Sequence, residues 1–184
     1  PKQFYNYKNK EIIDHSIEKS VNSKLFKKIL VVTNNINHLK KKKIHDSIKI
    51  IKGGKERSDS SLIALKYLKK YKPTNILIHD AARPDFTIKL LRELLVHLKK
   101  NMAVIPYINS KDTIKYRVKK EFYNLDRKNT YLTQTPQAFK FKKLYELAVN
   151  EKKKITDEAT LFVNQNKKIK FIKGENTNNK ITFK

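Results

Sequence analysis

Short runs of aliphatic and β-branched residues alternate with amphipathic stretches along the chain, and this alternation constrains the fold more than any other feature. It is typical of βαβ units, in which helices cover the faces of a parallel sheet. We therefore predict an α/β fold with a mostly parallel sheet. The predicted strands are 26–33, 49–52, 75–79, 103–107, 169–172 and a β-like end at 180–183. The predicted helices are 11–21, 58–71 with Ser58 as its cap, 87–99, 139–149 and 157–164.

The segment 111–134 breaks this alternation. Its apolar residues, among them Tyr116, Val118, Phe122 and Leu125, occur in short alternating pieces. Such pieces are typical of antiparallel hairpins, so we expect an antiparallel β-arm that projects from the sheet. With 184 residues and no visible linker or repeat, we expect a single domain over residues 1–184.

The charge of the chain is strongly positive, with 43 basic and 17 acidic side chains and a formal net charge of +26. Such a charge is typical of proteins that bind polyanions. Only five of the basic residues are arginine, however, and arginine is the residue that nucleic-acid surfaces favour. The lysines are spread through every segment, which indicates compositional drift. We expect no specific nucleic-acid partner, and a basic nucleic-acid-binding module stays the alternative class.

Several other classes of protein are excluded by composition. The chain contains no cysteine, which excludes disulfide frameworks, thiolate zinc sites and cysteine nucleophiles. Its longest apolar runs, such as 29–33 and 75–79, are far shorter than the ~20 residues that a membrane-spanning helix requires. We therefore expect no membrane partner.

A pair of glycines, Gly53 and Gly54, lies between a predicted strand and a predicted helix, and Arg57 and Ser60 follow it. Bare backbone amides at the start of a helix can hold an anion. A plain strand-to-helix turn with a serine cap explains the same residues. Both interpretations stay open at this point.

The run His79-Asp80-Ala81-Ala82-Arg83-Pro84 follows an apolar strand directly. Ligands of open α/β sheets bind at this carboxyl edge. Asp80 could hold a divalent cation, Arg83 could bind a phosphate, and the two alanines would let a ligand approach the backbone. The structural alternative is a buried Asp80–Arg83 pair that closes the loop. A histidine in the place of His79 is more often a packing residue than a catalyst.

Eight motifs occur in a fixed order along the chain. They are Pro1-Lys2-Gln3-Phe4, Gly53-Gly54-x-x-Arg57-x-x-Ser60, His79-Asp80-Ala81-Ala82-Arg83-Pro84, Asp112-Thr113, Asp126-Arg127, Gln134-Thr135-Pro136-Gln137-x-Phe139, Thr156-Asp157-Glu158-Ala159 and Asn179-Lys180-Ile181-Thr182. Together they resemble the 2-C-methyl-D-erythritol 4-phosphate cytidylyltransferase family over the entire chain. The ribitol-phosphate cytidylyltransferases are the nearest alternative, but Ala82 and Glu158-Ala159 fit the methylerythritol family better.

The resemblance implies a Rossmann-like nucleotidyltransferase of isoprenoid precursor biosynthesis, cytoplasmic or in a plastid stroma. It would join CTP to 2-C-methyl-D-erythritol 4-phosphate with Mg²⁺ as cofactor, release pyrophosphate, and form a homodimer through the arm. By motif match the catalytic residues would be Lys2 and Lys180, against the α-phosphate. The nucleotide-binding residues would be Gly54, Ser60, Asp80 (also the metal ligand) and Ala81. The substrate-binding residues would be Arg83, Asp112, Thr113, Arg127 (for the neighbouring subunit), Thr135 and Thr156.

The chain also departs from the family pattern. The family has a strand and a glycine-rich loop before the Pro1-Lys2 segment and a further helix after the Lys180 segment, and both are expected to be missing from residues 1–184. Because that loop supplies much of the triphosphate site, we expect these residues alone to be inactive. A catalytically inactive scaffold is a further alternative.

Overall fold

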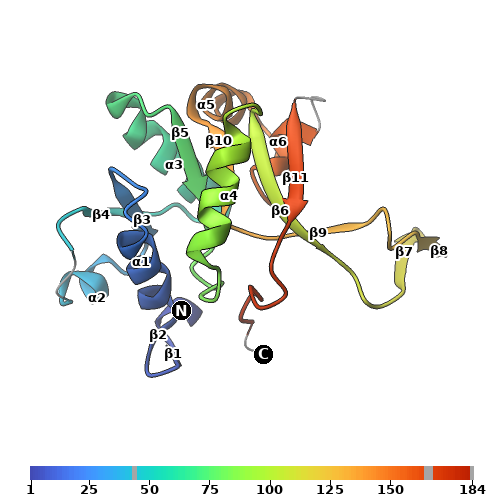
Figure 1. Ribbon diagram of the computed structural model, residues 1–184, viewed down its shortest axis with the longest axis horizontal. Coiled ribbons are helices and arrows are strands. Elements are labelled where there is room, and N and C mark those ends of the chain that lie inside the picture. The colour runs from blue at the N-terminus through green and yellow to red at the C-terminus, as the bar shows by residue number, and fades with distance from the viewer. Residues whose placement is uncertain (43–44, 164–167, 183–184) are drawn as a thin grey trace.

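The computed structural model describes residues 1–42, 45–163 and 168–182, and a five-stranded sheet forms its centre (Figure 1). The strands of this sheet are β5 (Asn75–Ile78), β6 (Ala103–Asn109), β9 (Tyr131–Thr133), β10 (Gln137–Lys140) and β11 (Ile169–Lys173). β11 is parallel to β6, whereas β10 lies antiparallel between β6 and β5. β5, β6 and β11 therefore run in one direction.

The N-terminal part of the chain forms a second, two-stranded parallel sheet with its own small core. The elements of this N-terminal part are η1 (Lys2–Phe4), β1 (Asn6–Tyr7), β2 (Lys10–Glu11), α1 (Ile12–Asn22), β3 (Ile29–Thr33), α2 (Ile36–Lys40) and β4 (Ile48–Lys52). The parallel sheet is formed by β3 and β4. Ile13 of α1, Val31 of β3 and Leu39 of α2 are buried together. Ala81 packs against this cluster, so the core supports the loop that follows β5.

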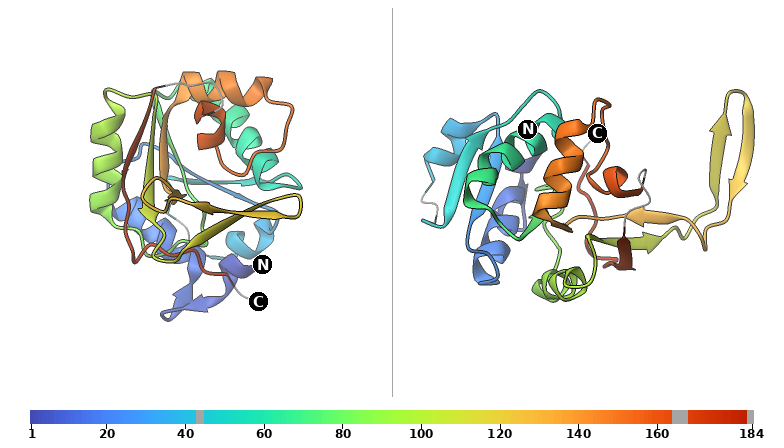
Figure 2. Two further views of the ribbon diagram at one scale, coloured as in Figure 1. Left: turned by 90° about the vertical axis from the view of Figure 1, so that its right-hand side faces the viewer. Right: turned by 90° about the horizontal axis from the view of Figure 1, so that it is seen from above.

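Helices cover both faces of the five-stranded sheet (Figure 2). They are α3 (Arg57–Leu68), extended by η2 (Lys69–Tyr71), α4 (Ile88–Leu98), α5 (Phe141–Asn150) and α6 (Ala159–Val163). Leu94 of α4 packs with Ala138 of β10 on one face. The next residue of β10, Phe139, packs with Leu65 of α3 and Leu144 of α5 on the other. This alternation gives three layers, and the predicted α/β sandwich is confirmed.

An antiparallel hairpin projects from the body of the molecule between β6 and β9 (Figures 1 and 2). Its strands are β7 (Ile114–Val118) and β8 (Glu121–Leu125), which pair with each other. β9 then pairs with the end of β6 and returns the chain to the sheet. The hairpin lies within the segment 111–134 that the sequence marks as an arm.

The structure corrects several predicted elements. The helix predicted from 139 begins at Phe141, because Phe139 and Lys140 belong to β10 and pair with β5. The helix α3 is capped by Glu56 and not by Ser58, since the Glu56 and Asp59 side chains form a capping box. Thr87 caps α4 by accepting a hydrogen bond from the Leu90 amide.

Near the C-terminal end of the chain two further boundaries differ from the prediction. The helix predicted over 157–164 begins only at Ala159, and Asn164 lies outside the described residues. Residues 180–182 do not form a strand, and Phe183 also lies outside the described residues.

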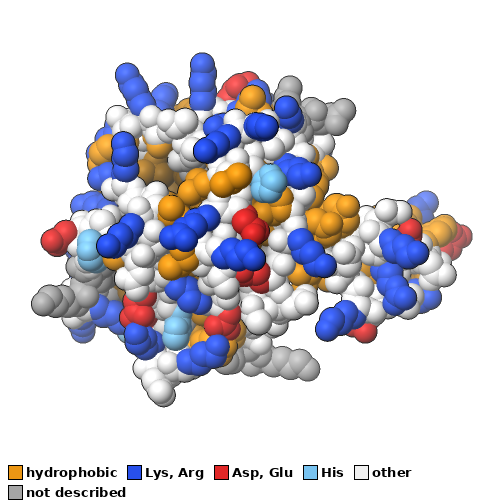
Figure 3. Space-filling view, viewed as in Figure 1, with side chains coloured by type: hydrophobic (Ala, Val, Ile, Leu, Met, Phe, Trp, Pro, Cys, Tyr) orange, Lys and Arg blue, Asp and Glu red, His pale blue; other side chains and the backbone are white. Residues whose placement is uncertain are grey.

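Basic side chains are scattered over the surface instead of gathering in one patch on the face shown in Figure 3. Within the part of the chain that the structure describes, no helix has the length and apolar character needed to cross a bilayer.

Candidate active site

Asp80 lies just after the carboxyl end of β5 and binds two cationic side chains. Its Oδ1 accepts a hydrogen bond from Arg57 Nε at 3.2 Å, and its Oδ2 accepts one from Lys180 Nζ at 2.8 Å. Burial by itself raises the pKa of the Asp80 carboxyl, but Lys180 and Arg57 together hold it below its usual value. Asp80 is therefore a carboxylate at neutral pH. The structural alternative, a pair of Asp80 with Arg83, does not form, because Arg57 and Lys180 bind the two oxygens of Asp80.

Arg57, the first residue of α3, joins Asp80 to a second carboxylate. Its Nη1 and Nη2 donate to Oε1 and Oε2 of Glu158 at 2.9 and 2.8 Å. Glu158 is only 1% exposed. Burial lowers the pKa of the Arg57 guanidinium, and the two carboxylates more than reverse this effect. A two-pronged pair of this kind fixes the direction of the guanidinium as well as its place, so it also fixes where Nε meets Asp80.

The loop between β4 and α3 is tightly turned around Gly54. The Gly54 amide donates to Ser60 Oγ at 3.1 Å, and its carbonyl accepts from Asn34 Nδ2 at 3.0 Å. A Cβ at position 54 would lie 2.3 Å from the Cβ of Asp59. Glycine is therefore required here by close approach, and the loop brings Gly54 and Ser60 to the same end of α3 as Arg57.

Thr135 supports Asp80 from the side of β10. Its Oγ1 accepts a hydrogen bond from the Asp80 amide at 3.0 Å and lies 3.2 Å from His79 Nδ1. His79 Nε2 lies 3.1 Å from the carbonyl of Arg83, which can only accept. Nε2 therefore carries the hydrogen, and Nδ1 accepts from the Thr135 hydroxyl. Burial lowers the pKa of His79 to about 4, so His79 is a neutral packing residue.

Arg83 is a half-buried cation that pairs with no carboxylate among the described residues. Its Nη1 donates to the carbonyl of Asn178 at 2.8 Å, and its buried Nε has no partner there. Burial lowers the pKa of Arg83, and the nearby Asp80 raises it. An arginine in this state has donors left for an anionic ligand.

Other predicted site residues are not brought to Asp80 by the contacts within one chain. Asp112, Thr113 and Arg127 are exposed at the root of the arm, where Arg127 Nη1 donates to the carbonyl of Lys111 at 3.2 Å. Thr156 is exposed beside α6. Lys2 lies in η1, and within the described residues its side chain makes no hydrogen bond or ion pair.

A metal ion at this site would depend on ligands from outside the chain. Among the described residues there is no group of three or more histidine, aspartate or glutamate side chains that could hold one. Mg²⁺ is commonly bound through one or two carboxylates together with substrate phosphates and water. A single carboxylate, Asp80, fits that pattern when a nucleotide supplies the remaining ligands.

The site contains residues that the sequence did not mark as functional. Glu158 follows Thr156-Asp157, a good helix start, and nothing in that pattern shows that its partner lies 101 residues away. Asn178 is also buried at the site. Arg57 did have sequence signals, because it follows the glycine pair and is one of three arginines, out of five in the chain, that lie within the motifs.

Known proteins resemble this chain along its whole length. The bifunctional enzyme IspD/IspF of Pelagibacter ubique is 50% identical over 185 residues, covering all of this chain and 50% of that protein. A 2-C-methyl-D-erythritol 4-phosphate cytidylyltransferase of Thermosipho melanesiensis is 31% identical over 193 residues, covering all of this chain and 85% of that protein. The chain thus spans half the length of the first relative.

The fold is similar to that of solved structures as well. The 4-diphosphocytidyl-2C-methyl-D-erythritol synthase of Anaerococcus prevotii matches with a TM-score of 0.87 at 27% identity, covering 98% of this chain and 87% of that one. A family model described as IspD, 2-C-methyl-D-erythritol 4-phosphate cytidylyltransferase, matches residues 1–184. Because this match takes in the loop around Gly54, Asp80 and the Lys180 segment alike, the chain belongs to the 2-C-methyl-D-erythritol 4-phosphate cytidylyltransferase family.

Proposed function

We propose that the protein transfers the cytidylyl group of CTP to 2-C-methyl-D-erythritol 4-phosphate and releases pyrophosphate, in isoprenoid precursor biosynthesis. The observation that carries this proposal is the meeting of Arg57, Thr135 and Lys180 on Asp80, since these residues come from separate segments of the chain. Family membership supports the same reaction. The cytoplasmic location implied by the resemblance stays part of the proposal.

The proposed reaction is an in-line displacement at the α-phosphorus of CTP. A phosphate oxygen of the second substrate attacks this phosphorus, a new P–O bond forms, and the bond to the bridging oxygen of the leaving pyrophosphate breaks. The task of the protein is to position the reactants and to stabilise the added negative charge. Lys180, whose side chain is 40% exposed, and Lys2 would stabilise the charge on the α-phosphate.

The other predicted residues would bind the two substrates. Arg83 has no carboxylate partner among the described residues, which suits a role in binding the phosphate of methylerythritol phosphate. Gly54, Ser60 and Ala81 would contact the cytidine portion of CTP. The remaining substrate contacts would come from Asp112, Thr113, Arg127, Thr135 and Thr156.

The proposed cofactor is Mg²⁺, with Asp80 as its protein ligand. The family is one of nucleotidyltransferases, and enzymes that transfer phosphoryl groups generally neutralise the phosphates with divalent metal ions. When bound, the ion would supply positive charge to the phosphates of CTP. Arg57 would hold Asp80 through Oδ1 and leave Oδ2, which now binds Lys180, to face the ligand.

We also propose that the hairpin of β7 and β8 joins two copies of the chain. A two-stranded hairpin is marginally stable in isolation, and this one exposes large apolar side chains. Phe122 is 67% exposed, and Tyr116 is more than half exposed. A second hairpin would cover these rings and would bring Arg127 close to the partner's site.

The proposal is tested with the full-length protein by measuring pyrophosphate release and identifying the nucleotide product by mass spectrometry. Methylerythritol phosphate and ribitol phosphate are offered separately with CTP and Mg²⁺. We expect turnover with methylerythritol phosphate, and loss of turnover in Lys180→Ala but not in the control Lys173→Ala, a lysine at the end of β11. Faster turnover of ribitol phosphate would favour the alternative family, and no release with either substrate would favour an inactive scaffold.

A further inference from the structure

Two buried amide side chains, Gln134 and Asn178, fasten the segment after β11 to the turn before β10. Gln134 is 2% exposed and Asn178 is fully buried. Gln134 Nε2 donates to the carbonyls of Glu175 and Asn178 at 2.9 and 3.2 Å, and its Oε1 accepts from the Glu175 amide at 3.0 Å. Asn178 Nδ2 donates to the carbonyl of Thr135 at 2.9 Å. We call these two residues the amide clamp.

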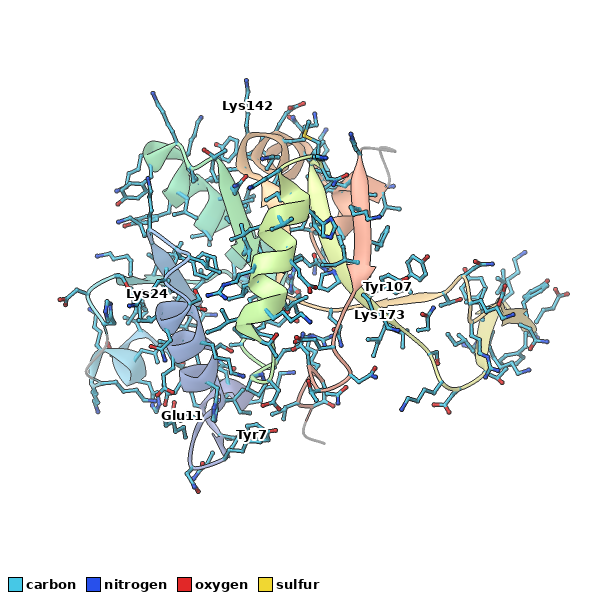
Figure 4. All side chains as sticks on the ribbon, in the orientation of Figure 1. Tyr7, Glu11, Lys24, Tyr107, Lys142 and Lys173 are labelled. Atoms are coloured by element: carbon cyan, nitrogen blue, oxygen red, sulfur yellow. The ribbon has the colours of Figure 1, made fainter. Side chains whose placement is uncertain are left out.

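Gly174 lets the segment approach the clamp. A Cβ at this position would lie 2.3 Å from Gln134 Oε1 and 3.1 Å from the carbonyl of Tyr107. The Gly174 amide donates to that same carbonyl at 2.7 Å. Figure 4 labels Tyr107 of β6 and Lys173, the last residue of β11, which lie opposite each other, and the segment leaves the sheet after Lys173. Any residue larger than glycine would displace the Gln134 side chain.

The clamp lies next to two cations of the candidate site. Lys180, which binds Asp80, comes two residues after Asn178, and the amide of Ile181 donates to the carbonyl of Ala82 at 2.8 Å. Arg83 donates from Nη1 to the carbonyl of Asn178. The backbone that carries Lys180 and the acceptor that orients Arg83 are thus held by the same buried amides.

We propose that Gln134 and Asn178 are positioning residues that fix Lys180 and Arg83 for the reacting phosphates. The inference rests on the proposed cytidylyl transfer, to which it adds these two residues. Both side chains are too deeply buried to serve as the main contact of a substrate. The segment that they hold, residues 174–182, forms no strand and so lacks the hydrogen bonds of a sheet. The Gln134 side chain makes three hydrogen bonds to this segment, and the Asn178 side chain makes one to Thr135. These bonds replace the ladder bonds that the segment lacks.

The proposal predicts a particular pattern of kinetic losses. Displacing a reacting group by ~1 Å can cost about 10²-fold in rate, so Gln134→Ala should lower kcat by ~10- to 100-fold. The KM for CTP should change little, because Lys180 acts on charge that develops during the reaction. Gly174→Ala should lower kcat in the same way, although it keeps both amides.

A double-mutant cycle with Lys180→Ala separates positioning from general stability. If Gln134 acts through Lys180, adding Gln134→Ala to Lys180→Ala should lower kcat by a smaller factor than adding it to the wild type, and the remaining loss would act through Arg83. The control is Leu98→Ala, which creates a cavity at the buried C-terminal end of α4. It should lower the melting temperature, leave kcat close to wild type, and combine with Lys180→Ala without coupling.

The outcomes distinguish the two proposals. The wild type could be active while the double variant loses kcat by the product of the two single losses. That result would overturn the positioning role of the clamp and leave the proposed function standing. A Gly174→Ala variant with wild-type kcat would do the same, and this variant answers the question if Gln134→Ala does not fold. A wild-type protein without transferase activity would overturn the proposed function and the clamp together.

Discussion

Asp80 is the residue on which the candidate site depends, because it holds two cations that are distant in sequence. Arg57 would keep its two bonds to Glu158 if the Asp80 carboxylate were removed. Lys180 would lose the one side-chain partner that it has among the described residues. Changing Asp80 should therefore disturb the chemistry of the site more than the fold around it.

We expect Asp80→Asn to reduce turnover by roughly 10²–10³-fold, the usual effect of losing one preorganised charged group in an active site. The melting temperature should fall only slightly, since Arg57 stays paired. The matched control is Asp85→Asn, which removes a carboxylate five residues away that binds Tyr7 and Lys8 and should leave turnover near wild type. Pyrophosphate release and thermal unfolding give both quantities, and equal turnover in the two variants would contradict the role of Asp80.

His79 predicts a pH dependence of stability. Its pKa falls from 6.5 to about 4 on folding because of burial, so the unfolded chain binds more protons between these pH values. The contribution of neutral His79 to the free energy of unfolding is fully present above pH 6.5. It is lost as the pH falls to 4, and the loss amounts to at most about 3 kcal/mol. Between pH 6.5 and 4, the free energy of unfolding should therefore fall less in His79→Gln than in the wild type, by up to this amount.

Urea unfolding at several pH values measures this difference. The control variant is His97→Gln, which changes an exposed histidine on α4, and the slope of His79→Gln is compared with it. If His79→Gln also keeps the full wild-type slope between pH 6.5 and 4, His79 does not titrate as described.

The place of a single residue in the fold could be predicted from the sequence where its neighbours in the chain explain it. Asp80 follows an apolar strand, and the carboxyl edge of a sheet is where ligand-binding side chains gather. Glu158 and Asn178 carry no such local signal, because their burial depends on partners from distant segments. Gly174 carries no local signal either, since a side chain there would meet Gln134 and the carbonyl of Tyr107, which belong to distant segments.

At the scale of elements, periodicity predicted the helices that have one apolar face. In α4 the residues Leu90, Leu91, Leu94 and Leu98 are all buried, and their spacing is that of a helix. β10 was missed because both of its faces are covered. Ala138 faces α4 while Phe139 faces α5, so the strand has no alternation of apolar and polar residues, and it runs directly into a helix.

The hairpin of β7 and β8 makes a prediction about assembly. Phe122→Asp should raise the dimer dissociation constant by ~10-fold or more, or at least about 1.4 kcal/mol, because a charge would replace an aromatic ring in the shared surface. Val96→Asp on α4, which is also more than half exposed, is the control and should leave assembly unchanged. Sedimentation velocity over a concentration series measures both, and a wild-type monomer at micromolar concentration would rule out the arm as a dimer contact.

At the scale of the whole molecule, the positive charge is dispersed. Lysine and arginine side chains are spread across the face in Figure 3 without forming one tract. Arg57 binds Asp80 and Glu158 in the candidate site, and Arg83 binds the carbonyl of Asn178 there. The exposed positive charge therefore comes mainly from lysine. Such a surface attracts polyanions without reading their sequence.

We therefore expect duplex DNA and RNA to bind weakly and without sequence preference. Neutralising about six phosphates would make the affinity fall by ~10³-fold between 50 and 200 mM salt. Fluorescence anisotropy with two unrelated duplexes at several salt concentrations tests this expectation. Tight binding to one sequence that survives high salt would revive the nucleic-acid interpretation.

The long sequence separations within the site also determine when it can form during synthesis. Arg57 and Glu158 are 101 residues apart, and Asp80 and Lys180 are 100 apart. At ~5–20 residues per second, a ribosome needs on the order of 5–20 s to add such a length of chain. Until Glu158 is added, the nascent chain carries Arg57 and Asp80 but has neither of their distant partners. The site can thus close only after residue 180 has left the exit tunnel, at least 100 residues after Asp80 has been added to the chain.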